Sequence, residues 1–164
     1  MATEVKGWPD WESWRSYSAD FIKAKERDWK LYEIKEPNEA IPNFVIGPWQ
    51  GWQENFERKN VQTFEYLVKN CRAWVEKNGK INKIKNDFPE ISEFIGILIK
   101  ETGEIVLFEG SHRAAAIALA KEMGQPIQFK NNPTIAIAEI SRDERDLLEE
   151  KLKRGTHEEL AQKK

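Results

Sequence analysis

One segment limits the possible folds more than any other: a hairpin pattern followed at once by a glycine and an alanine-rich helix. Two β-branched apolar runs, 95–99 and 105–108, flank a turn at 101–104, which is typical of a β-hairpin. Gly110 follows after one residue and precedes an alanine-rich stretch, which is predicted to form a helix that ends at Gly124. Small side chains let such a helix lie close against a sheet. The segment predicts a mixed α/β fold, with a small, partly antiparallel sheet and helices packed on it.

Apolar residues recur at regular spacing in the rest of the chain as well. These patterns predict a helix over 10–29, a short strand at 44–46, a helix over 61–77, a short helix over 87–94, a strand over 134–140 and a charged helix over 141–153. Asn60 is suited to start the 61–77 helix, and Asn78-Gly79 is suited to end it. Cys71 lies in the apolar stripe of that helix, which predicts a small buried thiol rather than a nucleophile.

The chain is predicted to form a single domain over residues 1–164, because this length suffices for one core of ordinary size. We divide it into a Trp-rich N-terminal region (1–60), a helical part (61–94), a core (95–140) and a C-terminal helix and tail (141–164).

Composition excludes several classes of protein. Hydrophobic residues make up 40% of the chain and charged residues 33%, which is typical of a globular protein with a charged surface. No apolar run approaches the roughly 20 residues of a membrane span, and the start of the chain lacks the pattern of a secretory signal. Cys71 is the only cysteine, so we expect no disulfide, no zinc site of several cysteines and a cytoplasmic location.

The net charge of −2 argues against nucleic-acid binding by bulk positive charge. Lysines do cluster in sequence at Lys77, Lys80, Lys83 and Lys85. The simplest interpretation is a solvated lysine-rich loop. Nucleic-acid binding stays open only if the basic side chains gather on one face.

The segment from Glu109 to Arg113 suggests chemistry, because it joins a strand to the start of a helix. A helix N-terminus presents unpaired backbone N–H groups and the positive end of the helix dipole. Cations are unfavourable there, so His112 and Arg113 make sense together if they share an anion, most simply a phosphate. Gly110 allows a sharp turn and lets a ligand approach the backbone. In the competing interpretation Ser111 is an N-cap, and the two basic side chains point to solvent or bond to acidic neighbours.

Residues 95–140 resemble the core of the ParB/sulfiredoxin superfamily. The resemblance is carried by the hairpin with Gly103 in its turn, the motif Glu109-Gly110-Ser111-His112-Arg113, the alanine run and Gly-Gln-Pro-Ile at 124–127. That family typically shows a strand, an acidic residue and glycine, two variable positions, arginine and an alanine-rich helix. The resemblance implies a small sheet with packed helices and a phosphate site at the strand-to-helix turn.

Branches of this superfamily differ in their chemistry at the motif. Sulfiredoxins carry a catalytic cysteine at the position of Ser111, and a hydroxyl cannot replace a thiolate in sulfinic-acid repair, so we do not expect a sulfiredoxin. Chromosome-partitioning ParB proteins carry a second phosphate motif for CTP, which residues 141–154 do not resemble. Free-serine kinases carry an acidic residue, glycine, a variable position, histidine and arginine, and they are the nearest match.

The resemblance implies a nucleotide or phosphate site at Gly110, Ser111, His112 and Arg113. Its enzymatic form would be a Mg²⁺-dependent phosphotransferase or nucleotide hydrolase that uses ATP or ADP and a small-molecule substrate. Phosphoryl transfer needs neutralised phosphate charge, a base or orienting carboxylate, and usually Mg²⁺. Glu109 is the candidate to ligate Mg²⁺ or to orient an acceptor hydroxyl. His112 is the candidate to contact phosphate or to carry a proton.

Trp49 and Trp52 lie in a predicted loop rich in glycine and proline, and they are candidates for stacking on the base or sugar of a substrate. The N-terminal region would then cover the phosphate site. An exposed aromatic face would instead suit a protein partner. The alternative function is a non-catalytic ParB-like module that binds nucleic acid or a protein partner. A nuclease is a third option, and the lack of a multi-carboxylate cluster near the motif argues against it.

Overall fold

A computed structural model describes residues 3–5 and 26–146, and it places five strands in one mixed sheet with the order β1-β2-β5-β3-β4. The strands are β1 (Thr3–Val5), β2 (Trp29–Glu33), β3 (Glu93–Ile99), β4 (Ile105–Glu109) and β5 (Thr134–Ile140). The central pair, β3 and β5, is parallel, and each of the other neighbouring pairs is antiparallel. The predicted class, a mixed α/β fold with a partly antiparallel sheet, is confirmed.

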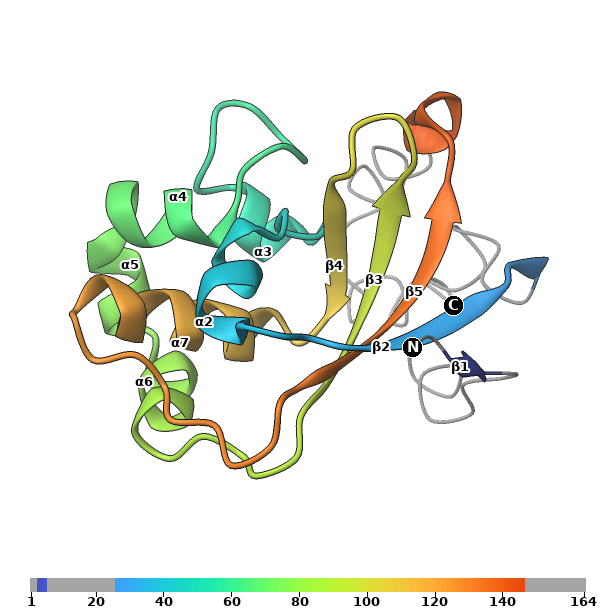
Figure 1. The fold of residues 1–164 in the computed structure, drawn as a ribbon. Coiled ribbons are helices and arrows are strands. Elements are labelled where there is room, and N and C mark those ends of the chain that lie inside the picture. The colour runs from blue at the N-terminus through green and yellow to red at the C-terminus, as the bar shows by residue number, and fades with distance from the viewer. Residues whose placement is uncertain (1–2, 6–25, 147–164) are drawn as a thin grey trace, which may run out of the picture.

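The helices gather on one side of the sheet, next to β4, whereas β1 and β2 lie at the opposite edge (Figure 1). They are α2 (Pro37–Ala40), η2 (Ile41–Asn43), α3 (Gln50–Gln53), α4 (Phe64–Asn70), α5 (Arg72–Lys77), α6 (Gly79–Asn86) and α7 (Ser111–Glu122), whereas η3 (Arg142–Arg145) lies apart from them at the end of β5. Helix α7 packs against both α4 and α6. Its residues 114–120 are buried, because their mostly alanine side chains let neighbouring helices approach closely. No helix in the described ranges has the length and apolarity needed to cross a membrane.

The hairpin, helix and strand predicted within residues 95–140 are confirmed. Strands β3 and β4 form the predicted hairpin, and Gly103 takes a positive φ of 75° in its turn. Helix α7 begins two residues after β4 ends, and Gly124, with a φ of 74°, follows its C-cap. Strand β5 covers the predicted 134–140.

The prediction of one helix over 61–77 is wrong in its continuity, because Cys71 breaks it with a φ of −125° between α4 and α5. Thr63, not Asn60, caps α4, since its hydroxyl accepts a hydrogen bond from the amide of Tyr66 at 3.1 Å. Asn78 is the C-cap of α5, as predicted for the end of the helix, and its side chain also caps the start of α6 by accepting from the amide of Ile81. The predicted lysine-rich loop is therefore helical from Gly79 onward.

Other predictions fail where tertiary pairing overrides local pattern. The short helix over 87–94 is wrong, because Phe94 pairs with Ile135 in the parallel β3–β5 ladder. The helix predicted for 10–29 does not extend to Trp29, which lies in β2, and its first sixteen positions lie outside the described residues. The predicted strand at 44–46 is reduced to bridges from Val45 to Val106 of β4 and to Thr63. Residues 142–145 form a 3₁₀ turn with Ser141 as its N-cap, and residues 147–153 of the helix predicted for 141–153 lie outside the described chain.

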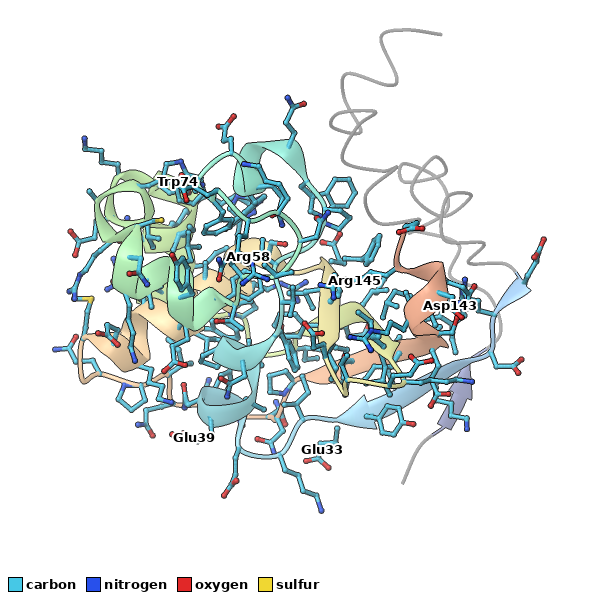
Figure 2. The ribbon with its side chains drawn as sticks, turned by 90° about the horizontal axis from the view of Figure 1, so that it is seen from above. Glu33, Glu39, Arg58, Trp74, Asp143 and Arg145 are labelled. Carbon is cyan, nitrogen blue, oxygen red and sulfur yellow. The ribbon has the colours of Figure 1, made fainter. Side chains whose placement is uncertain are left out.

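The side chain of Gln53 connects the residues before α3 to the segment between α3 and α4. The fully buried side chain donates to the carbonyl oxygens of Ile46 and Gly47, at 3.0 and 2.8 Å, and accepts from the amide of Asn60 at 2.8 Å. Arg145 reaches from η3 toward this segment (Figure 2), and its Nη2 donates to the carbonyl oxygen of Asn60 at 2.8 Å. The network fixes the path of the chain that lies beside β4.

We expect Gln53→Met to lower the free energy of unfolding by about 2 kcal/mol or more, because it leaves buried backbone groups without partners. Gln50→Met is the matched control, since Gln50 is exposed on the same short helix. Its effect should stay within about 0.5 kcal/mol. Urea unfolding of both variants measures the difference, and equal midpoints would contradict the role given to Gln53.

Candidate functional site

The motif lies at the end of the sheet where β4 turns into α7, and Gly110 makes that turn with a φ of 102°. A β-carbon at this position would lie 2.4 Å from Cδ1 of Phe94 and 3.1 Å from Nη2 of Arg113. Position 110 therefore requires glycine for two separate reasons, its backbone conformation and the close approach of the Phe94 ring. The glycine also brings the helix start directly against β3.

The N-terminus of α7 has no side-chain cap in the described part of the chain, because its N-cap residue is Gly110. The carbonyl oxygen of Gly110 accepts the first helical hydrogen bond, from the amide of Ala114 at 2.9 Å. Ser111 is the first residue of the helix and is 9% exposed, so the interpretation of Ser111 as the N-cap is wrong. The first-turn amides and the positive end of the helix dipole favour an anion here.

Arg113 does not point freely into solvent. Its Nη1 donates to Oγ of Ser92 at 2.7 Å, and its guanidinium carbon lies 4.7 Å from the centroid of the Phe94 ring. Burial lowers the pKa of Arg113, while the nearby carboxylates of Glu109 and Glu93 raise it. An arginine stays charged under such opposing influences, so the site keeps one fixed positive charge.

Two carboxylates flank this arginine. Glu109 is the last residue of β4, and its Oε2 atom is screened from solvent. Glu93 is the first residue of β3 and is exposed. Sequence reasoning named Glu109 but missed Glu93, Ser92 and Phe94, because the incorrect helix over 87–94 placed them outside the sheet. Their only signal was that they stand directly before the hairpin.

The structure brings Trp52 next to the motif. The Trp52 ring meets the His112 ring edge to face, with centroids 5.1 Å apart and an angle of 71° between the planes. Trp52 also contacts Phe64 and Trp74 in the same manner. The aromatic cluster gives the His112 ring a defined place in the first turn of α7.

The predicted loop that carries the two tryptophans is replaced in part by the single turn α3. Trp49 and Trp52 are 9% and 8% exposed, and Trp49 packs on Phe108 with ring centroids 6.3 Å apart. Neither residue presents an open ring face for stacking on a base or sugar in this structure. Both belong to the core that supports the motif.

A dedicated metal centre is absent from the described residues, because no three His, Cys, Asp or Glu side chains lie together in them. A cavity of about 340 Å³ contains none of the motif residues. It is lined by Glu26, Arg27, Asp28, Lys30, Tyr32, Lys100, Ile137 and Glu139.

No protein-family model matches this chain, and neither a curated protein nor a solved structure matches it at a significant level. The resemblance to the ParB/sulfiredoxin superfamily rests on residues 95–140 alone. Function is therefore argued from the geometry of the Glu109–Arg113 turn and its neighbours.

We expect Gly110→Ala to destabilise the protein by about 3 kcal/mol, because it adds a clash with Phe94 to the strain of a positive φ. Gly124→Ala is the matched control, since Gly124 also has a positive φ but open space around a β-carbon. It should cost only about 1 kcal/mol. Thermal or urea unfolding compares the two, and similar losses would show that the Phe94 contact does not constrain position 110.

Proposed function

We propose that this protein binds the phosphate groups of a nucleotide or another phosphorylated small molecule at the turn formed by Gly110, Ser111, His112 and Arg113. The observation that supports this most is the start of α7, where the N-cap Gly110 offers no side chain to the first-turn amides and Nη2 of Arg113 lies 3.1 Å from the point that a β-carbon of Gly110 would occupy. Backbone N–H groups and a guanidinium are the donors that phosphate oxygens prefer. The resemblance to the ParB/sulfiredoxin superfamily points to the same turn.

The most concrete enzymatic version is a small-molecule phosphotransferase that uses Mg²⁺ with ATP or ADP. Glu109 is the last residue of β4, next to the turn. There it would ligate Mg²⁺ or orient an acceptor hydroxyl toward a phosphate held by the turn. His112 is in the first turn of the helix, where it can contact a phosphate oxygen or carry a proton. When bound, Mg²⁺ would neutralise charge that develops on the phosphates.

The alternative is a non-catalytic module that binds nucleic acid or a protein partner. One observation favours nucleic acid: Lys77, Lys80 and Lys83 are exposed along the end of α5 and on α6. None of them forms an ion pair with a described residue. These lysines would contact phosphates of a nucleic-acid backbone, and such binding weakens steeply with salt.

We expect one nucleotide among ATP, ADP, CTP and GTP, tested with and without Mg²⁺ beside inorganic phosphate, to raise the melting temperature. Ligand at about 100 times its dissociation constant adds about 2.7 kcal/mol to stability. The shift should vanish in Arg113→Ala and persist in Arg72→Ala, a control at an exposed arginine of α5. Glu109→Gln should keep the binding shift and lose phosphate transfer.

The absence of a shift with every ligand, in a wild-type protein that is folded, would overturn the phosphate proposal. Binding of oligonucleotides with a steep dependence on salt, reduced by Lys80→Ala, would favour the nucleic-acid alternative.

A further inference from the structure

Two segments that are 21 residues apart in sequence meet at the motif through Ser92 and Arg113. Ser92 is 7% exposed, and its hydroxyl accepts from Nη1 of Arg113 at 2.7 Å, a short distance typical of a charge-assisted hydrogen bond. The carbonyl oxygen of Ser92 accepts from the amide of Thr134 at 3.0 Å, at the start of β5. The position of the hydroxyl is therefore fixed by the central parallel strands.

The guanidinium is held from a second direction by Phe94, which lies two residues after Ser92, in β3. Its carbon lies 4.7 Å from the centroid of that ring, which restricts the tilt of the guanidinium plane. A guanidinium has five N–H donors in a planar fork, and the bond to Ser92 uses one of them. Fixing Nη1 and the plane together fixes where the remaining donors point.

The opposite end of the fork faces the start of α7. Nη2 of Arg113 lies 3.1 Å from the point that a β-carbon of Gly110 would occupy. Nη2 and Nε of Arg113 donate no hydrogen bond to any described residue. The unused donors thus lie beside the turn whose backbone amides favour an anion.

We propose that Ser92 is the positioning residue of this site, which orients Arg113 so that its Nη2 end faces an anion bound at the first turn of α7. For the bound anion this inference rests on the proposed function. The orientation of Arg113 by Ser92 is tested separately. A long side chain that is already oriented loses less conformational freedom when a ligand binds, so Ser92 strengthens binding without touching the ligand.

A purely structural role predicts something different. If the Ser92–Arg113 bond only joins α7 to β3, its loss lowers stability and leaves the affinity of the folded protein unchanged. Thr63→Ala is the matched control for stability, because it also removes a hydroxyl acceptor, at the start of α4 and away from the motif.

The first measurement is the ¹⁵N spectrum of the Arg113 guanidinium, assigned with Arg113→Lys. A guanidinium held at one end rotates slowly, so the wild type should show separate Nη1 and Nη2 signals. Ser92→Ala should merge them, while Ser92→Thr should restore them and Thr63→Ala should leave them separate. Ser92→Cys, which keeps the size of serine with a much weaker acceptor, gives the same comparison if Ser92→Ala fails to fold.

The second measurement is calorimetric titration with inorganic pyrophosphate. We expect about tenfold weaker binding in Ser92→Ala, because the Arg113 side chain must then be ordered when the ligand binds. Ser92→Thr and Thr63→Ala should bind within about twofold of the wild type.

Merged guanidinium signals in the wild type, or unchanged signals and affinity in Ser92→Ala, would overturn the role of Ser92. Separate signals that merge in Ser92→Ala, with neither pyrophosphate binding nor a melting shift with any nucleotide in the wild type, would support the orienting role and overturn the proposed function instead.

Discussion

The parallel pairing of β3 with β5 is the constraint on which the rest of the structure depends. It holds seven residues of each strand in register, from Glu93 beside Thr134 to Ile99 beside Ile140. Both strands are largely buried, as expected for a parallel pair in the middle of a sheet. Because β3 also forms the hairpin with β4, the pairing fixes the point where β4 ends and α7 begins. Ser92, directly before β3, is thereby placed against the first turn of a helix far along the chain.

The electrostatics of the motif follow from this placement. Arg113 gives up part of its hydration when it packs against Phe94, which is unfavourable for a charged group. Glu109 and Glu93 offset that loss without forming a direct ion pair with it among the described contacts. A positive charge that is oriented but incompletely neutralised suits the binding of an anion better than a closed salt bridge does.

Local pattern was sufficient for the hairpin, for α7 and for β5, because each is marked by its own residues: β-branched runs, the glycines at 103 and 124, and the alanines of 114–120. Local pattern was insufficient where contacts with a distant segment determine the secondary structure. Phe94 looked like the end of a short helix until β5 paired with it, and Cys71 broke a helix whose apolar stripe continues on both sides. Within the candidate site, Glu109 to Arg113 were predicted from their order in the chain. Ser92 was not, because nothing in the sequence signals a contact with Arg113, which lies 21 positions further along the chain.

The segment beside β4 has a further consequence. The amide of Val45 donates to Ile105, and the amide of Leu107 donates to Val45, so this segment occupies backbone groups on the outer edge of the sheet. The fit depends on Gly47, where a β-carbon would lie 2.1 Å from the carbonyl oxygen of Leu107. An edge strand with unoccupied groups is a template for pairing with other molecules. Self-association through this edge is thus restrained by the chain itself. A side chain at position 47 would push the segment away from β4, and the exposed edge would then favour aggregation.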